Sequence, residues 1–295
     1  MGERQAEKKR LDVLLVEKGL APSRERAQAQ VMEGRVFVDG VLVDKPGAKV
    51  KWEAAVEVRG DAVPYASRGG IKLAAALDRF GIEVDGRTAL DCGASTGGFT
   101  DCLLKRGAKK VYAVDVGYGQ IDWRLRRDPR VVCLERTNIR YLTRDRLGEC
   151  VDMATLDVSF ISLTKVWPAV SGLVVAGGDV LSLVKPQFEV GRGRVGKKGV
   201  VRDLALHREV LLDLIRCAAG LGLAFSDVWY SPIRGPEGNI EFWLHLKNGT
   251  GDPSDRADVD MLVERTVDAA HRAFGGSAVA RGAGSNEEDR HHTQS

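Results

Sequence analysis

The stretch from Leu90 to Thr100, which reads LDCGASTGGFT, constrains the fold of this 295-residue chain more than any other. The apolar run at its start predicts the end of a buried strand. Gly93, Gly97 and Gly98 predict a tight turn that lets the backbone approach a ligand closely. A helical pattern follows from Phe99 to Arg106. A strand, a glycine turn and a helix in this order are typical of the opening unit of a Rossmann-like sheet.

Further strands alternate with helices beyond this turn, so we expect an α/β fold with a doubly wound, mostly parallel sheet. The expected strands cover residues 88–92, 110–114, 131–134, 153–156, 179–184, 224–230 and 240–246. The expected helices cover residues 70–80, 98–106, 163–175, 203–221 and 261–274. Because no helix separates the last two strands, we expect them to pair antiparallel.

Residues 10–60 have the pattern of a separate, small α+β domain. Apolar residues at helical spacing predict two short helices, over 11–18 and 23–32, each followed by a glycine. Asp39-Gly40 lies between two apolar runs and is the strongest hairpin signal in the chain. A strand over 55–58 completes this unit.

These patterns divide the chain into four expected parts. They are a small domain (8–61), a linker (62–67), an α/β domain (68–248) and a polar, partly disordered C-terminal tail (249–295). The stretch from Asp252 to Ser295 holds five Arg and nine Asp or Glu, which gives it a net charge of −4. Because the whole chain has a net charge of +3, the remaining residues carry +7. A moderately basic globular part is compatible with nucleic acid.

Several classes of protein do not fit the composition. No stretch approaches the roughly 18 apolar residues that a membrane-spanning helix needs. The charged start of the chain lacks an apolar signal region, so we expect a cytoplasmic protein. The cysteines lack paired spacing, so we expect neither a disulfide framework nor a metal site. They are Cys92, Cys102, Cys133, Cys150 and Cys217.

Polar side chains follow the expected strands, at the edge where an open α/β sheet binds ligands. They are Asp91, Asp115, Asn138, Asp157 and Lys185. Asp115 lies where a carboxylate accepts hydrogen bonds from a ribose, which NAD and S-adenosylmethionine share. The pattern Gly93-x-x-x-Gly97-Gly98 differs from the spaced triplet of dinucleotide enzymes and favours S-adenosylmethionine, which has no pyrophosphate. A Rossmann oxidoreductase stays open as an alternative.

Four charged residues stand out as candidates for catalysis: Lys72, Asp157, Lys185 and Glu241. Lys185 follows an apolar strand, and its amine should project over the edge of the sheet. Glu241 interrupts an apolar run, where a carboxylate usually needs a partner. The spacing alone is equally compatible with two structural ion pairs.

The small domain resembles a known RNA-binding module. Arg10-Leu11-Asp12, Ser23-Arg24 with Ala27, and Gly34-x-Val36-x-Val38-Asp39-Gly40 are similar to the ribosomal-protein-S-four-type domain. The resemblance implies that two helices and a hairpin present basic side chains to structured RNA.

A second basic segment lies in the α/β domain. The stretch from Lys185 to Arg208 holds seven Lys or Arg and predicts a basic loop that clamps RNA. The expected RNA-binding residues are Arg10, Arg24, Arg35, Lys45, Arg68, Arg192 and Lys197.

The four candidate catalytic residues resemble the Lys-Asp-Lys-Glu tetrad of FtsJ/RrmJ-like ribose 2′-O-methyltransferases. The wider pattern is similar to the TlyA (hemolysin A) family. It includes Ser67-Arg68-Gly69-Gly70-x-Lys72, Asp157-Val158-Ser159-Phe160, Val184-Lys185-Pro186 and Gly235-Pro236-x-Gly238-Asn239-x-Glu241. This resemblance implies S-adenosylmethionine-dependent cytidine 2′-O-methylation of ribosomal RNA in ribosomal subunits. The implied cofactor-binding residues are Asp91, Gly93, Ser95, Gly97, Gly98, Phe99, Asp115, Asn138 and Asp157.

The chemistry explains why such a tetrad would be needed. A ribose 2′-hydroxyl is a poor nucleophile until its proton is removed or strongly hydrogen-bonded. The pKa of an ordinary lysine is about 10.4, and burial beside a second cation lowers it. We expect Lys185 to be the base or orienter, tuned by Lys72. Asp157 would hold Lys185 and face the cofactor sulfonium, and Glu241 would orient the lysines or the ribose.

Two further functions compete with this hypothesis: a ribosome-assembly factor that binds RNA without catalysis, and a membrane-active hemolysin. The sequence predicts no strongly amphipathic apolar helix, which counts against the membrane-active hemolysin. The sequence does not show the oligomeric state, and a monomer is our default expectation.

Overall fold

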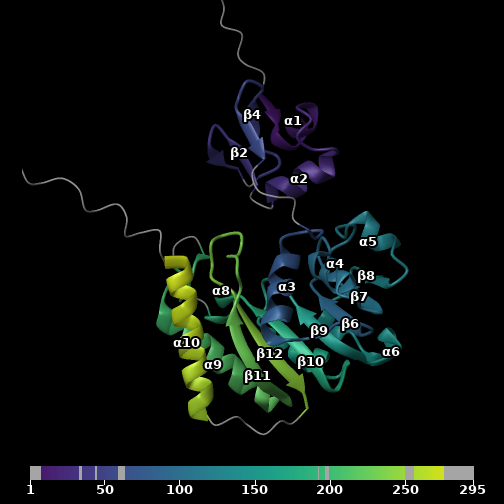
Figure 1. The fold of residues 1–295 in the computed structure, drawn as a ribbon, viewed down its shortest axis with the longest axis vertical. Helices are drawn as coiled ribbons and strands as arrows, with labels where there is room; N and C mark the ends of the chain where they lie inside the picture. The colour runs from purple at the N-terminus through teal and green to yellow at the C-terminus, as the bar shows by residue number, and fades with distance from the viewer. Residues whose placement is uncertain are drawn as a thin grey trace, which may run out of the picture.

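The computed structural model describes residues 8–32, 35–43, 45–58, 64–191, 193–196, 199–249 and 256–275. A small N-terminal domain stands over a larger α/β domain, with helix α2 on the side that faces the large domain (Figure 1). The α/β class, the doubly wound sheet and the small α+β domain that the sequence predicted are confirmed.

The described residues of the small domain form two helices and two short antiparallel sheets. Its elements are β1 (Lys8–Arg10), α1 (Leu11–Glu17), α2 (Arg24–Met32), β2 (Val36–Val38), β3 (Val41–Leu42), β4 (Lys49–Lys51) and β5 (Val56–Val58). One sheet has the order β3-β2-β5 and the other pairs β1 with β4. Asp39 and Gly40 both have positive φ in the predicted hairpin turn. Strands β1 and β4 were not predicted, because three mostly charged residues carry no apolar alternation.

The large domain is built on a seven-stranded sheet. Its strands are β6 (Thr88–Cys92), β7 (Lys110–Val114), β8 (Val131–Leu134), β9 (Val151–Leu156), β10 (Val174–Val184), β11 (Leu223–Tyr230) and β12 (Phe242–Asn248). Their order is β11-β12-β10-β9-β6-β7-β8. The predicted antiparallel pairing of the last two strands is confirmed, and β12 lies between β10 and β11, antiparallel to both.

The chain order reverses between β6 and β9, which lie side by side and parallel. In an open α/β sheet the crevice beyond the carboxyl ends of two such strands is the usual ligand site. The sheet therefore places the glycine turn after β6 next to Asp157, which follows β9 directly.

Helices cover both faces of the sheet. They are α3 (Gly69–Phe80), α4 (Gly98–Lys105), α5 (Trp123–Arg127), α6 (Arg144–Leu147), α7 (Trp167–Ser171), α8 (Pro186–Glu189), α9 (Leu204–Gly220) and α10 (Arg256–Gly275), with 3₁₀ turns η1 (Ile139–Tyr141) and η2 (Leu163–Lys165). Helices α3 and α4 share one apolar core, and α7, α9 and α10 share the other. In the part of the chain with described helices, none is long and apolar enough to cross a membrane.

The predicted helix over 163–175 is wrong. Only η2 and the short α7 form there, and β10 already begins at Val174. Val174 pairs with Val151 of β9, and the ladder is interrupted before it resumes at Asp179. Pairing in the sheet therefore decides the conformation of an apolar stretch whose spacing also suits a helix.

The C-terminal stretch contributes more to the fold than its polar composition indicated. Helix α10 begins at Arg256, ahead of the predicted start at 261. Val263, Val267 and Ala270 are fully buried in the core shared with α9 and the sheet. The predicted disorder over 275–295 falls almost wholly on 276–295, outside the described residues, as do residues 62 and 63 of the predicted linker.

Candidate active site

The four charged candidates meet at the carboxyl edge of the sheet, although they are far apart in sequence. Lys185 follows β10, Asp157 follows β9, Glu241 precedes β12, and Lys72 lies on the first turn of α3. Lys72 Nζ donates to Glu241 Oε2 at 2.6 Å, and Lys185 Nζ lies 2.6 Å from Asp157 Oδ1. The charges of Asp157 and Lys185 also act on Glu241, so the two pairs form one cluster.

Burial makes this cluster electrostatically sensitive. The side chain of Glu241 is only 1% exposed, while that of Asp157 is 21% exposed. Burial raises the pKa of the Glu241 carboxyl, and the positive charge of Lys72 opposes this rise. Lys185 Nζ also donates to Ser159 Oγ at 2.8 Å, so two oxygens fix its position. A Cβ atom at Gly235 would lie 2.5 Å from Glu241 Oε1, so the carboxylate needs a glycine there.

The glycine turn brings backbone close to this cluster. Gly93 has φ +87°, and a Cβ there would lie 2.5 Å from the carbonyl oxygen of Asp157. Gly97 has φ +92°, and its Cβ would meet Leu125 at 2.3 Å. Gly93 therefore requires glycine on two grounds, a left-handed backbone and the lack of space beside a backbone carbonyl, and Gly97 requires it for its left-handed backbone.

Asp115 fixes the same turn from the neighbouring strand. Its Oδ2 accepts the Ser95 N–H at 2.8 Å, and its Oδ1 accepts the Gly117 N–H at 2.7 Å. The carboxylate is only half-buried. Each oxygen has a second lone pair, so Asp115 can still accept hydrogen bonds from ribose hydroxyls.

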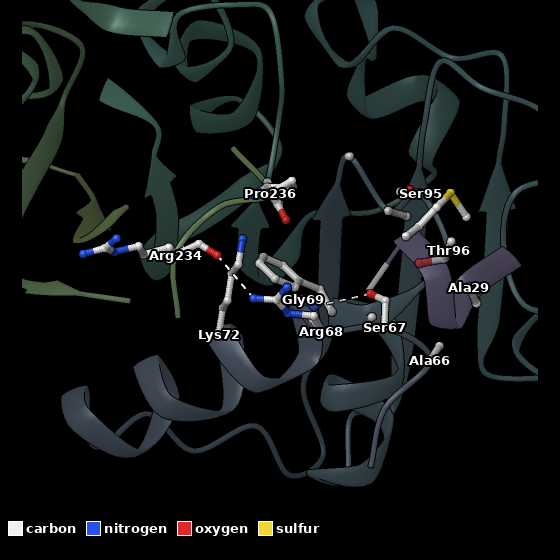
Figure 2. Close-up of a pocket in the computed structure, with 16 residues that line it drawn as sticks. Ala29, Ala66, Ser67, Arg68, Gly69, Lys72, Ser95, Thr96, Arg234 and Pro236 are labelled. Atoms are coloured by element: carbon white, nitrogen blue, oxygen red, sulfur yellow. Dashed lines mark hydrogen bonds between the residues drawn. The ribbon is translucent and has the colours of Figure 1, made fainter. Parts of the chain in front are cut away.

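A cavity of about 290 Å³ lies between the glycine turn and the charged cluster. In Figure 2 Arg68 lies just before α3 and Lys72 on its first turn, Ser95 and Thr96 lie on the glycine turn, and Ala29 belongs to α2. The cavity is lined by Ala29, Met32, Ala66, Ser67, Arg68, Gly69, Lys72, Gly93, Ala94, Ser95, Thr96, Gly98, Phe99, Asp157, Arg234 and Pro236. Its volume is near the lower end for small-ligand pockets, about 300–1,000 Å³.

Four predicted cofactor residues do not line the cavity: Asp91, Gly97, Asp115 and Asn138. Asp91 is fully buried below the turn, where its Oδ2 accepts the Thr100 hydroxyl at 2.7 Å. Burial raises the pKa of Asp91 to about 7, and its Oδ1 has no hydrogen-bond partner among the described residues. Asn138 is exposed, and its side chain caps η1 by accepting the Arg140 N–H at 3.1 Å.

The cavity and the residues beside it fit a small ligand that carries a positive charge and a ribose. The glycines leave room for it, Asp115 offers carboxylate oxygens, and Asp91 holds an unpartnered buried oxygen near the turn. This is the donor set that S-adenosylmethionine requires. Within the described ranges, no group of three or more His, Cys, Asp or Glu side chains is arranged to hold a metal ion.

The predicted RNA-binding residues fall into several places. Arg10 and Arg24 converge on the buried carboxylate of Asp12, with N–O distances of 2.9 and 3.1 Å. Lys45 is exposed before β4 and Arg35 is half-buried before β2. Arg68 lines the cavity, while the predicted Arg192 and Lys197 lie outside the described residues.

Sequence reasoning missed several residues of the cavity wall. Ser67, Gly69 and Pro236 lie inside motifs that were noticed, so a signal was present for them. Ala29 and Met32 come from α2 of the small domain. Nothing in their spacing indicates a ligand site, because only the packing of the two domains brings α2 to the cavity.

Comparison with known proteins matches both parts of the chain. The FtsJ-like methyltransferase model matches residues 65–248, and the S4 domain model matches residues 9–56. The chain is 47% identical, over 91% of its length and 98% of the relative, to the 16S/23S rRNA (cytidine-2′-O)-methyltransferase TlyA of Mycobacterium tuberculosis. It is 42% identical to Hemolysin A of Brachyspira hyodysenteriae, over 80% of this chain and 99% of that protein.

The fold comparison agrees. A structure from Streptococcus thermophilus, described as a candidate hemolysin, superposes with a TM-score of 0.72 at 42% identity. The match covers 92% of this chain and 98% of that one. The arrangement of a small domain beside the methyltransferase-type sheet is therefore shared over almost the whole length.

Proposed function

The chain belongs to the FtsJ-like methyltransferase family, and from this premise we propose that it methylates the 2′-hydroxyl of a cytidine ribose in ribosomal RNA, with S-adenosylmethionine as the methyl donor. The observation that carries this proposal is the meeting of two lysine–carboxylate pairs beside the glycine turn. Such a cluster can handle the proton of a hydroxyl, which a base-methylating site does not need.

The roles of the four residues follow from their contacts. Lys185 Nζ, held by Asp157 and Ser159, binds the 2′-hydroxyl and takes its proton or orients its lone pair. Lys72 and Glu241 hold a second, more buried pair that sets the field at Lys185. S-adenosylmethionine, when bound, supplies an activated methyl group on a sulfonium. Gly93, Ser95, Gly97, Gly98, Phe99 and Asp115 would hold it, with Asp91, Asn138 and Asp157 around them.

The RNA would be delivered by the S4 domain. We take residues 8–61 as the RNA-binding unit and 68–248 as the catalytic unit, joined by 62–67, with ribosomal subunits as the partner. Helix α2 supports this arrangement, because Ala29 and Met32 border the cavity. The hemolysin name of some relatives does not favour membrane damage as the function, because methyl transfer accounts for the charged cluster and the glycine cavity.

The substitution Lys185→Ala tests the proposal. We expect it to abolish 2′-O-methyl transfer to ribosomal RNA, measured with a radiolabelled methyl donor, because no group remains to position the hydroxyl. Binding of S-adenosylmethionine, measured by calorimetry, should stay within a few-fold of the wild type. The matched control is Lys109→Ala, an exposed lysine that lies beside the strand β7 and far from the cluster. Full activity of the Lys185→Ala protein would rule out the role given to this lysine.

A further inference from the structure

A second cavity of about 320 Å³ lies at the outer edge of the large sheet, where β11 is the last strand. Helices α3 and α10, which cover opposite faces of the sheet, both border this cavity (Figure 1). We call it the aromatic pocket, because three of its lining side chains are aromatic. The lining consists of Ala75, Trp229, Tyr230, Pro232, Ala273 and Phe274, none of which lines the cavity of the proposed active site.

The three rings of the aromatic pocket contact one another. The ring centroids of Trp229 and Tyr230 lie 4.8 Å apart, and Phe274 meets Tyr230 edge-on at 6.1 Å. Among the described residues, no Leu, Ile, Val or Met lines the pocket, so its apolar wall consists of rings, two alanines and a proline. Such a wall suits a planar partner that stacks on aromatic side chains.

Polar groups around the rings are available to a ligand. The indole N–H of Trp229 and the hydroxyl of Tyr230 have no hydrogen bond to the residues that the structure describes. The Arg234 guanidinium lies 5.0 Å from the ring centroid of Phe274 and donates to the carbonyl of the same residue. Arg234 has no carboxylate partner within the described ranges, whereas Arg79, which lies over Trp229, forms an ion pair at 3.2 Å. The pocket therefore combines stacking surfaces, hydrogen-bonding groups and one uncompensated cation.

The aromatic pocket lies beside the charged cluster of the proposed active site. In the sheet Tyr230 pairs with Phe242, the residue that follows Glu241. The next residue of the chain, Ser231, donates its N–H to the Glu241 carbonyl at 2.9 Å. A single strand pairing therefore connects the pocket to the proposed catalytic carboxylate.

One loop residue belongs to the surroundings of both cavities. Arg234 lines the cavity of the proposed active site, where its carbonyl accepts a hydrogen bond from Arg68 at 3.4 Å. Figure 2 shows the Arg234 guanidinium pointing away from that cavity. The same guanidinium lies over the Phe274 ring of the aromatic pocket. A strand that leaves the active site past Arg234 would therefore meet the aromatic pocket.

We propose that the aromatic pocket holds an unstacked nucleobase from a nucleotide that flanks the methylated one, and that Arg234 contacts a phosphate of the same RNA strand. The inference rests on the proposed function, since it names a second contact of the same substrate. A base stacks on aromatic rings whatever its identity, and its edge can hydrogen-bond to nearby polar groups. The contact keeps the strand unpaired beside the ribose that reacts.

A proline-rich peptide is the main competing occupant, because aromatic grooves also bind extended proline helices. RNA is favoured on two grounds. Arg234 supplies a cation without a carboxylate partner in the described part of the chain, which matches a phosphate. The pocket also adjoins the cavity that an RNA ribose must enter.

The double variant Tyr230→Leu/Phe274→Leu tests the proposal in the full-length protein. Leucine keeps apolar volume but cannot stack, so the affinity for a fluorescein-labelled oligouridylate of about 12 nucleotides should fall about tenfold. The affinity for an RNA duplex of the same length should keep its wild-type value, because paired bases do not enter the pocket. The kcat/KM for methylation of ribosomal RNA should also fall about tenfold, while the affinity for S-adenosylmethionine stays within a few-fold.

A second variant tests the charge without touching the rings. Arg234 is exposed, so Arg234→Gln should fold like the wild type. The loss of one phosphate contact should make the slope of log affinity for the oligouridylate against log salt shallower by about 0.7. An unchanged slope would overturn the phosphate contact.

Two controls make the result specific. Phe225→Leu removes a ring near the opposite end of β11 and should bind the oligouridylate like the wild type. Tyr230→Phe/Phe274→Tyr keeps both rings and should also bind like the wild type. The proposal is overturned if the Leu double variant binds the oligouridylate as tightly as the wild type, or if it loses equal affinity for the single strand and the duplex.

Three further outcomes separate the hypotheses. If the wild type binds the oligouridylate through these rings but transfers no methyl group to ribosomal RNA, the proposed function fails while the aromatic pocket stands. If the Leu double variant methylates ribosomal RNA with the wild-type kcat/KM, the base in the pocket does not come from the substrate and the proposal is wrong. If that variant loses binding to a decaproline peptide and keeps its affinity for the oligouridylate, the pocket binds a peptide and the RNA assignment is wrong.

Discussion

The side chain of Asn239 connects two loops at the proposed active site. It is 1% exposed and lies two residues before Glu241. Its Oδ1 accepts the Val201 N–H at 2.9 Å, and its Nδ2 donates to the Gly199 carbonyl at 3.0 Å. Asn239 therefore ties the basic loop to the turn that carries Glu241, and we expect it to act on catalysis through this carboxylate.

We expect Asn239→Ala to lower kcat for methyl transfer about tenfold or more, a loss of at least 1.4 kcal/mol, with little change in the KM for RNA, because Glu241 is no longer held. One buried and one partly buried backbone group lose their partners, which should lower the free energy of unfolding by about 1–3 kcal/mol. The matched control is Asn248→Ala at the other end of β12, where the amide donates to Ser171 and Val174. That variant should lose stability in urea but keep its kcat. Equal effects on kcat in both variants would contradict a positioning role for Asn239.

At the scale of elements, helix α10 is attached to the sheet domain through a pair of histidines. His207 Nδ1 of α9 lies 2.9 Å from His271 Nε2 of α10, and His207 is fully buried against Phe242. Burial lowers the pKa of His207 to about 4 and also lowers the pKa of His271. Both rings are therefore neutral in the folded protein at pH 7, where one donates and the other accepts.

This pair predicts a stability that depends on pH. The pKa of His207 in the unfolded chain is about 6.5, so the unfolded state binds more protons between pH 6.5 and about 4. The contribution of His207 to the free energy of unfolding is therefore fully present above about pH 6.5, and it is lost as the pH falls through this window. His207 alone contributes roughly 3 kcal/mol of this loss.

Urea unfolding at pH 7.5 and pH 5 measures the effect. We expect the free energy of unfolding to differ less between pH 7.5 and pH 5 in the variant His207→Leu. Leucine cannot bind the proton and keeps an apolar side chain in the core. An unchanged difference would mean that other groups cause the acid sensitivity.

At the scale of the whole molecule, the two domains have separate apolar cores. The core of the small domain is built from its own helices and strands, and the two cores of the large domain lie on opposite faces of the sheet. The domains meet at the cavity, where α2 supplies Ala29 and Met32. The separate cores predict that the large domain folds alone, while the shared cavity predicts that it needs the small domain to act on RNA.

Deletion of residues 1–63 tests both expectations. We expect the shortened protein to keep the circular dichroism spectrum of its sheet domain and a cooperative thermal transition. Its kcat/KM for ribosomal RNA should fall about a hundredfold or more, because a tethered second contact contributes 10²–10⁴ in affinity. Near-wild-type methylation of ribosomal RNA by the shortened protein would mean that the small domain is dispensable for delivery.

The sequence by itself determined the elements whose signal is local. The strand before Gly93, the hairpin at Asp39-Gly40 and the amphipathic face of α9 each depend on residues a few positions apart. A turn that requires positive φ, or an apolar stripe at helical spacing, is written in neighbouring residues and needs no knowledge of distant ones. The family motifs then indicated the reaction, because residue types that carry chemistry recur in a fixed order.

Only the tertiary structure decided which charges are partners and which surfaces meet. Lys72 finds Glu241 across 169 positions of sequence, and Lys49 lies opposite Arg10 across 39. The strand at Val174 forms because β9 is beside it, and α2 reaches the cavity because the domains pack together. Ion pairing, strand pairing and cavity walls depend on distances in space, and the local spacing of residues does not encode those distances.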